Sequence, residues 1–143
     1  MVTRLLSSLI SNTKKSVLLL GPRQVGKSTL ISSLKPSLTI NLSDEMEFYT
    51  FSSTPAELRA RMDALKPKTV FLDEIQRLPS LLNTVQFLLD RDKDLRFFLT
   101  GSSARKLKRG GANLLPGRVL NFHLGPLTAA ELGYAADTRK LLT

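Results

Sequence analysis

The sequence has 143 residues, which is enough for one domain with a buried core and too few for two ordinary domains. Its hydrophobic content of 42% indicates an ordered globular protein, and the absence of cysteine excludes disulfides and thiolate metal sites. The formal net charge of +9 favours an anionic partner, either a nucleic acid or the phosphates of a nucleotide.

The N-terminal residues carry apolar side chains at helical spacing (Leu5, Leu6, Leu9 and Ile10), and this pattern predicts an amphipathic helix. A secretory hydrophobic segment would be longer, and no stretch of the sequence approaches the roughly 18 apolar residues that cross a membrane. We therefore expect a cytoplasmic protein without a membrane partner, which agrees with the absence of cysteine.

Short apolar runs alternate with helical patterns along the chain, which is typical of a parallel sheet built from βαβ units. Strands are predicted at residues 16–20, 38–42, 69–73, 95–100 and 119–124. Helices are predicted at residues 27–34, 54–65 and 81–89, and from residue 128 onward. The acidic segment 43–48 is predicted to be a turn.

The first strand leads into Gly21-Pro22-Arg23-Gln24-Val25-Gly26-Lys27-Ser28, which matches the Walker A pattern G-x-x-x-x-G-K-[ST] in full and precedes a predicted helix. The glycines let backbone N–H groups surround a β-phosphate, and the helix N-terminus adds partial positive charge. Lys27 is expected to reach the β and γ phosphates, the Ser28 hydroxyl to coordinate Mg²⁺ and Thr29 to touch the α-phosphate. The alternative is a glycine-rich turn with a solvated lysine.

The strand at residues 69–73 ends in two adjacent carboxylates, Asp73 and Glu74. Because side chains alternate along a strand, we expect the two to point to opposite sides and to have different functions. Asp73 would hold Mg²⁺, as the acidic residue of a Walker B strand does. Glu74 would act as a general base on a water in line with the γ-phosphate. The alternative is a strand that simply ends in two surface acids.

Two other classes of phosphate-loop protein are not supported by the sequence. It contains neither the Asn-Lys-x-Asp sequence by which GTPases recognise guanine nor the Leu-Ser-Gly-Gly-Gln signature of transporter ATPases. What remains is an ATPase with an added catalytic glutamate, so ATP and Mg²⁺ are the expected cofactors.

The strand at residues 95–100 runs into small polar residues at its end. In ATPases of this kind the strand lies between the phosphate-loop strand and the acidic strand, with a polar side chain near the γ-phosphate. Ser102 is predicted as that sensor, with Thr100 and Ser103 as the next choices. Ser102 or Ser103 could equally cap a helix that begins near Ala104.

Further basic residues are candidates for anion contacts. Arg118, before the last strand, is a candidate arginine finger for its own site or for a neighbour's in a homo-oligomer, with Arg105 as the competitor. A surface salt bridge is the alternative for each. The residues Arg105, Lys106, Lys108 and Arg109 form what we call the basic patch. It predicts DNA binding or, alternatively, a solvated helix end.

Four segments, GPRQVGKSTL, VFLDEIQRLP, FFLTGSSARKL and LPGRVLNFHLGPLTAAEL, resemble in this order the AAA-type ATPases of bacteria and archaea, and among them AAA family fourteen. The resemblance covers nearly the whole chain and is most specific in the last segment. It implies an α/β, three-layer P-loop NTPase fold with a five-stranded parallel sheet in the order 5-1-4-3-2, flanked by helices.

The resemblance also implies functions for single residues. Lys27 and Ser28 would bind phosphate and Mg²⁺, Asp73 would bind Mg²⁺, Glu74 would act on water, and the Ser102 region would be the sensor. Gln76 and Arg77 match family positions to which the sequence assigns no function.

Members of that family are typically much longer and usually carry a second, C-terminal domain of uncharacterised function. We therefore expect residues 1–143 to form a single ATP-binding domain that is truncated before such a domain, or that acts with a separate partner protein. The leading interpretation is an Mg²⁺-dependent ATPase that hydrolyses the β-γ phosphoanhydride bond. The alternatives are a nucleotide-dependent switch or interaction module with little turnover, associated with DNA, and a small-molecule kinase.

Overall fold

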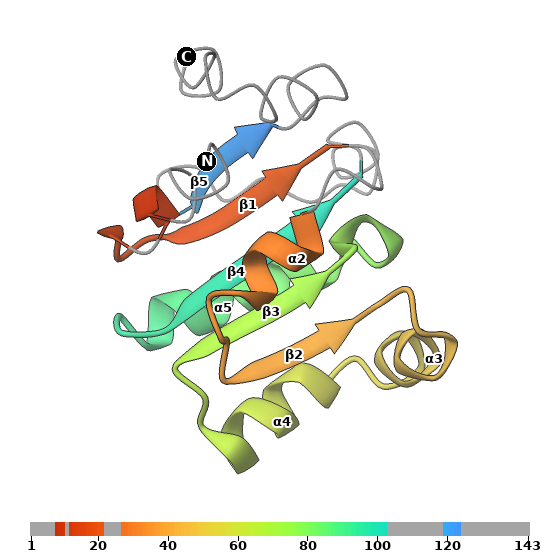
Figure 1. Ribbon diagram of the computed structural model, residues 1–143. Helices are drawn as coiled ribbons and strands as arrows, with labels where there is room; N and C mark the ends of the chain where they lie inside the picture. Colours follow the sequence, from red (N-terminus) through yellow and green to blue (C-terminus); the bar gives the residue numbers. More distant parts are fainter. Residues whose placement is uncertain (1–7, 11, 22–26, 103–118, 124–143) are drawn as a thin grey trace.

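The computed structural model describes residues 8–10, 12–21, 27–102 and 119–123 (Figure 1). Its strands are β1 (Ser16–Leu20), β2 (Leu38–Asn41), β3 (Thr69–Asp73), β4 (Arg96–Gly101) and β5 (Val119–His123). Residues 8–10 and 12 are helical, and the further helices are α2 (Lys27–Ser32), α3 (Glu45–Ser53), α4 (Glu57–Leu65) and α5 (Leu81–Arg91), with the 3₁₀ turn η1 at Ile75–Arg77. The helix predicted from residue 128 lies outside the described residues.

The strands form one sheet in the order β2-β3-β4-β1-β5, and each neighbouring pair is parallel (Figure 1). This is the predicted order 5-1-4-3-2, counted from the other edge, so the predicted fold class is confirmed. Because the strands are parallel, the carboxyl ends of β1, β4 and β3 lie side by side at one edge of the sheet.

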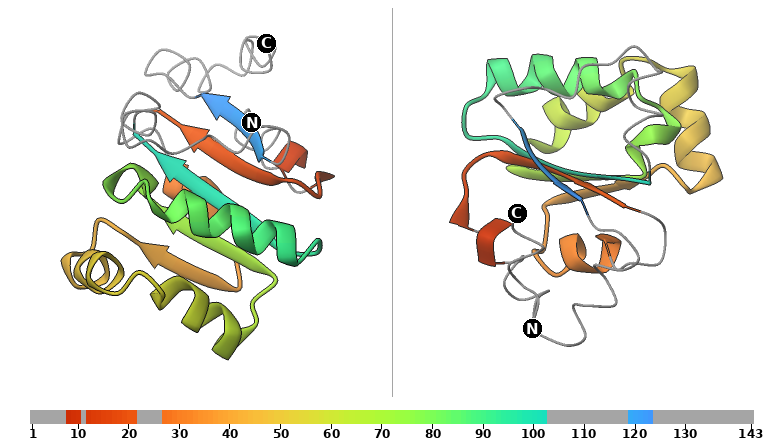
Figure 2. Two further views of the ribbon diagram at one scale, coloured as in Figure 1. Left: turned by 180° about the vertical axis from the view of Figure 1, so that it is seen from behind. Right: turned by 90° about the horizontal axis from the view of Figure 1, so that it is seen from above.

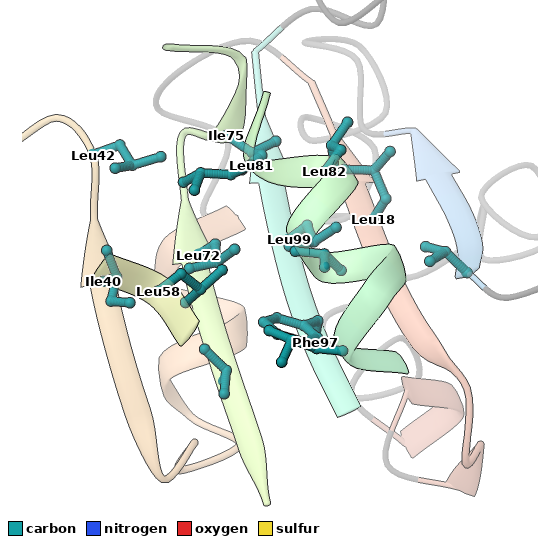
Figure 3. Close-up of a cluster of buried hydrophobic side chains, with 14 of the residues drawn as sticks. Leu18, Ile40, Leu42, Leu58, Leu72, Ile75, Leu81, Leu82, Phe97 and Leu99 are labelled. Atoms are coloured by element: carbon teal, nitrogen blue, oxygen red, sulfur yellow. The ribbon is translucent and has the colours of Figure 1, made fainter. Parts of the chain in front are cut away.

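Helices cover both faces of the sheet, with α2 on one side and α3, α4 and α5 on the other (Figure 2). Alternation along β1 divides its apolar side chains between two cores: Leu18 and Leu20 belong to the cluster beneath α3, α4 and α5, and Val17 and Leu19 to the cluster beneath α2. Figure 3 shows the larger cluster, in which Phe97 of β4 is fully buried. Burial on both faces explains why the central strands read as continuous apolar runs.

The acidic segment 43–48, predicted as a turn, is a turn only at residues 43 and 44, and from Glu45 onward it belongs to α3. Asp44 is the N-cap residue, and its Oδ1 accepts hydrogen bonds from the backbone N–H groups of Met46 at 2.9 Å and Glu47 at 3.3 Å. Glu45 and Glu47 stand in the first turn, where negative charge is favourable beside the helix N-terminus. The acidic residues that resemble a polar turn therefore begin a helix.

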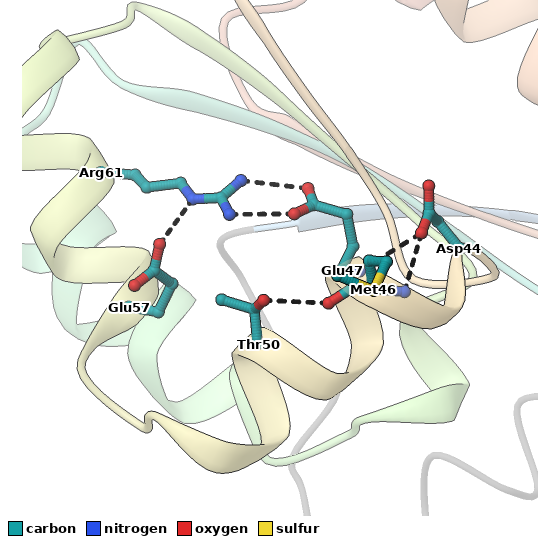
Figure 4. Close-up of polar contacts among 6 residues, drawn as sticks. All are labelled: Asp44, Met46, Glu47, Thr50, Glu57 and Arg61. Carbon is teal, nitrogen blue, oxygen red and sulfur yellow. Dashed lines mark hydrogen bonds and ion pairs between the residues drawn. The ribbon is translucent and has the colours of Figure 1, made fainter.

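Helix α4 begins at Glu57, later than predicted, and Arg61 of this helix contacts α3 (Figure 4). The Arg61 guanidinium donates two hydrogen bonds to the Glu47 carboxylate, at 2.9 and 3.0 Å, and one to Glu57 at 2.8 Å. It also lies 4.6 Å from the centroid of the Phe51 ring. The hydrogen bonds with Glu47 raise the pKa of Arg61 above its ordinary value, against the opposing effect of partial burial. One side chain thus joins two helices that together cover the β2 end of the sheet.

Among the described residues, no helix is long and apolar enough to cross a membrane.

The Arg61 contacts lead to a stability prediction. Arg61→Met should lower the free energy of unfolding by about 1–2 kcal/mol, because it removes charge-assisted hydrogen bonds to two partly buried carboxylates. Arg59→Met is the matched control, since Arg59 stacks on Phe87 at 4.4 Å without such a pair of carboxylates. It should cost about 0.5 kcal/mol. Urea unfolding measures both, and equal losses would contradict the importance of the Glu47 contact.

Candidate functional site

The carboxyl edge of the sheet brings together the ends of the phosphate-loop strand and the acidic strand. Strand β4 lies between them, with Leu20 of β1 in register with Gly101 and Leu72 of β3 in register with Leu99. The backbone N–H of Gly21 donates to the Gly101 carbonyl at 3.1 Å, so the chain is still paired with β4 as it leaves β1. Residues 22–26 of the loop lie outside the described residues, and the chain returns at α2.

Lys27 opens α2 and is buried, with 5% of its surface exposed. Its Nζ donates a hydrogen bond to the carbonyl oxygen of Gly21, so the ammonium group lies at the point where the loop leaves β1. Thr29, also on α2, is exposed. A buried ammonium at the start of a helix supplies positive charge where the helix N-terminus already attracts anions.

Ser28 and Asp73, which are distant in the sequence, meet at this edge. The Ser28 hydroxyl donates to both carboxylate oxygens of Asp73, at 3.0 Å to Oδ1 and 2.9 Å to Oδ2. Both side chains offer the hard oxygen ligands that Mg²⁺ prefers, and Mg²⁺ in nucleotide sites takes its other ligands from phosphates and water. The residues present therefore fit a Mg²⁺ ion.

Thr100, in β4, is the side chain that contacts both acidic residues. It is fully buried, with 0% of its surface exposed. Its hydroxyl donates to Asp73 Oδ1 and accepts a hydrogen bond from the backbone N–H of Glu74 at 3.1 Å. Ser102, the first choice for the sensor position, makes its described contact through its backbone N–H, which donates to Gln76 Oε1. Thr100, which follows the apolar run Phe97–Leu99, was one of the next choices for this position.

Glu74 follows directly on β3 but does not continue the strand. Its backbone is left-handed, with φ 62° and ψ 52°, so the alternation from which opposite directions were expected stops at Asp73. For a residue other than glycine this conformation costs about 1–2 kcal/mol. Such strain is concentrated at functional sites in proteins.

The two carboxylates have different surroundings. Only 8% of the Glu74 surface is exposed, and its Oε2 accepts a hydrogen bond from Gln76 Nε2 at 2.8 Å. Asp73 is half-buried and faces Ser28 and Thr100. Sequence reasoning gave Gln76 no function, because a polar residue just after a strand is indistinguishable from a surface residue until its burial is known.

Arg118 and the basic patch lie outside the described residues.

Ligands of open parallel sheets bind at the carboxyl ends of the strands, and at this edge a phosphate-loop sequence meets a pair of Mg²⁺-type ligands. The fold is accordingly of the P-loop NTPase class. Within that class, the chain belongs to the AAA domain family, and family fourteen of these domains matches residues 13–133. The predicted family is therefore confirmed, and with it an AAA-type, nucleotide-binding domain.

A curated relative is the uncharacterised protein Mb2031c of Mycobacterium bovis, which is 32% identical over 127 residues. The match covers 86% of this chain and 28% of that protein, so the chain spans little more than a quarter of its relative's length.

Two solved structures share the fold at low sequence identity. One contains Pif1 helicases at forked double-stranded DNA, with a TM-score of 0.56, 13% identity, and coverage of 87% of this chain and 42% of that one. The other is a candidate primosome component from Streptococcus pyogenes serotype M3, with a TM-score of 0.50 and 18% identity. That match covers 86% of this chain and 75% of the other. At these identities the similarity concerns the fold alone.

The position of Thr100 leads to a second prediction. Thr100→Val keeps the shape of the side chain but takes the acceptor from the Glu74 backbone N–H and one of two donors from Asp73 Oδ1, which should lower the free energy of unfolding by about 1–3 kcal/mol. Thr100→Ser keeps the hydroxyl and should cost less. Thr39→Val, on the exposed side of β2, is the matched control and should change stability by less than about 0.5 kcal/mol. If chemical unfolding shows Thr100→Val to equal the control, the hydroxyl does not hold the acidic pair.

Proposed function

We propose that the chain is an ATP-binding, Mg²⁺-dependent ATPase domain that hydrolyses the β-γ phosphoanhydride bond. The observation that carries the proposal is the contact of Ser28 with Asp73, with the buried carboxylate of Glu74 directly following. A switch that only binds nucleotide needs the first two residues, whereas a buried carboxylate beside them suits a general base. Membership of the AAA domain family supports the nucleotide-binding part.

The proposed binding groups are Lys27 and the backbone N–H groups of residues 23–26, since Pro22 has none and that of Gly21 is bonded to Gly101. Buried positive charge at the start of α2 would bind the β and γ phosphates more strongly than it could in bulk water, because the local dielectric constant is low. Ser28 and Asp73 would hold Mg²⁺, which neutralises charge on the phosphate oxygens when it is bound.

The proposed catalytic group is Glu74. Its carboxylate would accept a proton from a water molecule as the water oxygen bonds to the γ-phosphorus and the bond to the β-γ bridging oxygen breaks. ADP and inorganic phosphate are the products. Thr100 touches both Asp73 and the backbone of Glu74, so it would fix the spacing between the metal ligand and the base. Ser102 and Arg118 remain proposals as sensor and arginine finger, the latter in a homo-oligomer or in the same chain.

The third prediction tests the base. Glu74→Gln should lower kcat by about 10²- to 10⁴-fold, because the amide cannot accept the proton, while the dissociation constant for ATP changes little. Glu45→Gln is the matched control on the exposed start of α3 and should keep wild-type turnover. Phosphate release, measured with and without Mg²⁺, gives the rate, and calorimetric titration gives the affinity.

Lys27→Ala separates real activity from contamination, because a variant that has lost its phosphate ligand should neither bind nor hydrolyse ATP. If wild type and Glu74→Gln bind ATP equally and neither hydrolyses it, the alternative of a nucleotide-dependent switch is favoured. If both hydrolyse it at the same rate, Glu74 is not the base. Hydrolysis that persists after Mg²⁺ is chelated would contradict the metal requirement.

DNA is the macromolecular partner that we propose for the basic patch, on the strength of the +9 net charge. The fourth prediction is that duplex DNA binds with an affinity that falls steeply with salt, and that replacing the basic patch with alanine flattens this dependence by roughly 3–4 in log–log slope. The control removes as many exposed charges just before β1 and β3: Lys14, Lys15, Lys66 and Lys68. Equal losses in the two variants, measured by fluorescence anisotropy, would show that no particular patch is the contact.

The output of ATP turnover is proposed to act on a further domain or a separate protein. The basis is that this chain spans 28% of the length of its mycobacterial relative. We further propose that residues 1–143 form a single ATP-binding domain and that the protein is cytoplasmic.

A further inference from the structure

Gln76 lies between the proposed base and the end of β4. Only 8% of its surface is exposed. Its Nε2 donates to Glu74 Oε2 at 2.8 Å, and its Oε1 accepts a hydrogen bond from the backbone N–H of Ser102 at 3.1 Å. The side-chain amide therefore links the carboxylate that follows β3 to the segment that follows β4.

The orientation of this amide is determined by its partners. A carboxylate accepts hydrogen bonds and a backbone N–H donates them, so the amide nitrogen must face Glu74 and the amide oxygen must face Ser102. An amide turned by 180° would lose both contacts. The hydrogen bonds thus fix the plane of the Gln76 side chain, and with it the direction from which Glu74 is approached.

Two backbone features bring Gln76 into this position. The left-handed conformation of Glu74 and the turn η1 fold the chain back, so that residue 76 reaches the side chain of residue 74. On the other side, Gly101 has no side chain where the amide approaches β4. A Cβ at that position would lie 3.1 Å from Gln76 Oε1 and 3.1 Å from Leu20 Cδ2, closer than ordinary contacts allow.

We propose that Gln76 is a positioning residue, whose amide holds the Glu74 carboxylate in its working orientation and makes that orientation depend on the end of β4. The inference rests on the proposed ATPase function, in which Glu74 acts on water. A glutamate side chain has three rotatable bonds, and a catalytic group displaced by about 1 Å loses about 10²-fold in rate. Gln76 itself touches no reacting atom in this proposal.

The fifth prediction compares two glutamines under the same substitution. Gln76→Met keeps the approximate size of the side chain and removes both hydrogen bonds, so kcat should fall by about 10- to 100-fold while the dissociation constant for Mg²⁺·ATP stays within about twofold. Gln86→Met, on α5 and half-buried, is the matched control and should keep the wild-type kcat. Steady-state turnover and calorimetric ATP binding are measured on the 143-residue chain.

Gln76→Glu separates the two hydrogen bonds of the amide. It keeps the oxygen that accepts from Ser102 but lacks the N–H that donates to Glu74, and it places a second carboxylate against Glu74. Its kcat should therefore fall at least as far as that of Gln76→Met, although the contact with Ser102 is retained.

A second readout needs no activity. The Ser102 amide should exchange with solvent slowly in the wild type and in Gln76→Glu, both of which retain an acceptor for it. In Gln76→Met it should exchange about 10-fold faster or more, because the acceptor is gone. NMR or mass-spectrometric hydrogen exchange measures this in the absence of nucleotide.

The outcomes separate the two levels of the proposal. If the wild type hydrolyses no more ATP than Lys27→Ala, the ATPase function fails and the positioning role fails with it. If the wild type is active and Gln76→Met has an equal or higher kcat, the positioning role alone is overturned. The same holds if Gln86→Met loses as much as Gln76→Met, or if Gln76→Glu keeps the wild-type kcat.

Discussion

The hydroxyl of Thr100 is the interaction on which the arrangement of the site depends. It lies in the middle strand of the three whose ends meet at the carboxyl edge, and it is fully buried. It donates to the side chain of Asp73 and accepts from the backbone of Glu74, so one atom contacts two consecutive residues with different environments. In such a buried position the loss of a hydrogen bond is costly, because water cannot replace the lost partner.

This contact requires the parallel order of the sheet. The chain pairs β4 with β1 on one side and with β3 on the other, although β2 and β3 follow β1 in sequence. Strand β4 therefore lies between the phosphate-loop strand β1 and the acidic strand β3, and β2 lies at the edge beyond β3. Apolar side chains on both faces of β4, such as Phe97 and Phe98, hold it in the two cores. Packing on both faces thus determines where the polar end of the strand lies.

The sequence predicted the elements of the fold better than its irregular segments. Continuous apolar runs located the strands, because burial on both faces leaves little ambiguity in such a pattern. Their spatial order came from the family resemblance, since apolar runs carry no information on which strands are neighbours. The turn predicted for residues 43–48 holds for residues 43 and 44 and is wrong from Glu45 onward, because Asp44 and Glu45 are typical both of turns and of helix N-termini, and only the buried Phe51 further along distinguishes the two.

For the candidate site, the sequence identified the motif residues but not the irregular backbone that follows β3. The motif placed Lys27, Ser28 and Asp73 in one site, and the structure brings Ser28 and Asp73 into contact. The surroundings of Glu74 could not be predicted, because a left-handed residue after a strand has no reliable signature unless it is glycine. Gln76 was named from the family resemblance but given no function for the same reason, since its burial and both of its contacts follow from that change of direction.

Thr100 and Gln76 connect the same two segments from opposite sides. Thr100 reaches from β4 to the end of β3, and Gln76 reaches from the turn after β3 back to the residue that follows β4. A displacement of the end of β4 therefore acts on Asp73 through one hydrogen bond and on the Glu74 carboxylate through the other. Since Gly21 is also hydrogen-bonded to Gly101, the start of the phosphate loop is tied to the same strand end. The segments proposed to bind phosphate, hold the metal and act on water are thus all hydrogen-bonded to the carboxyl end of β4, and their relative positions depend on it.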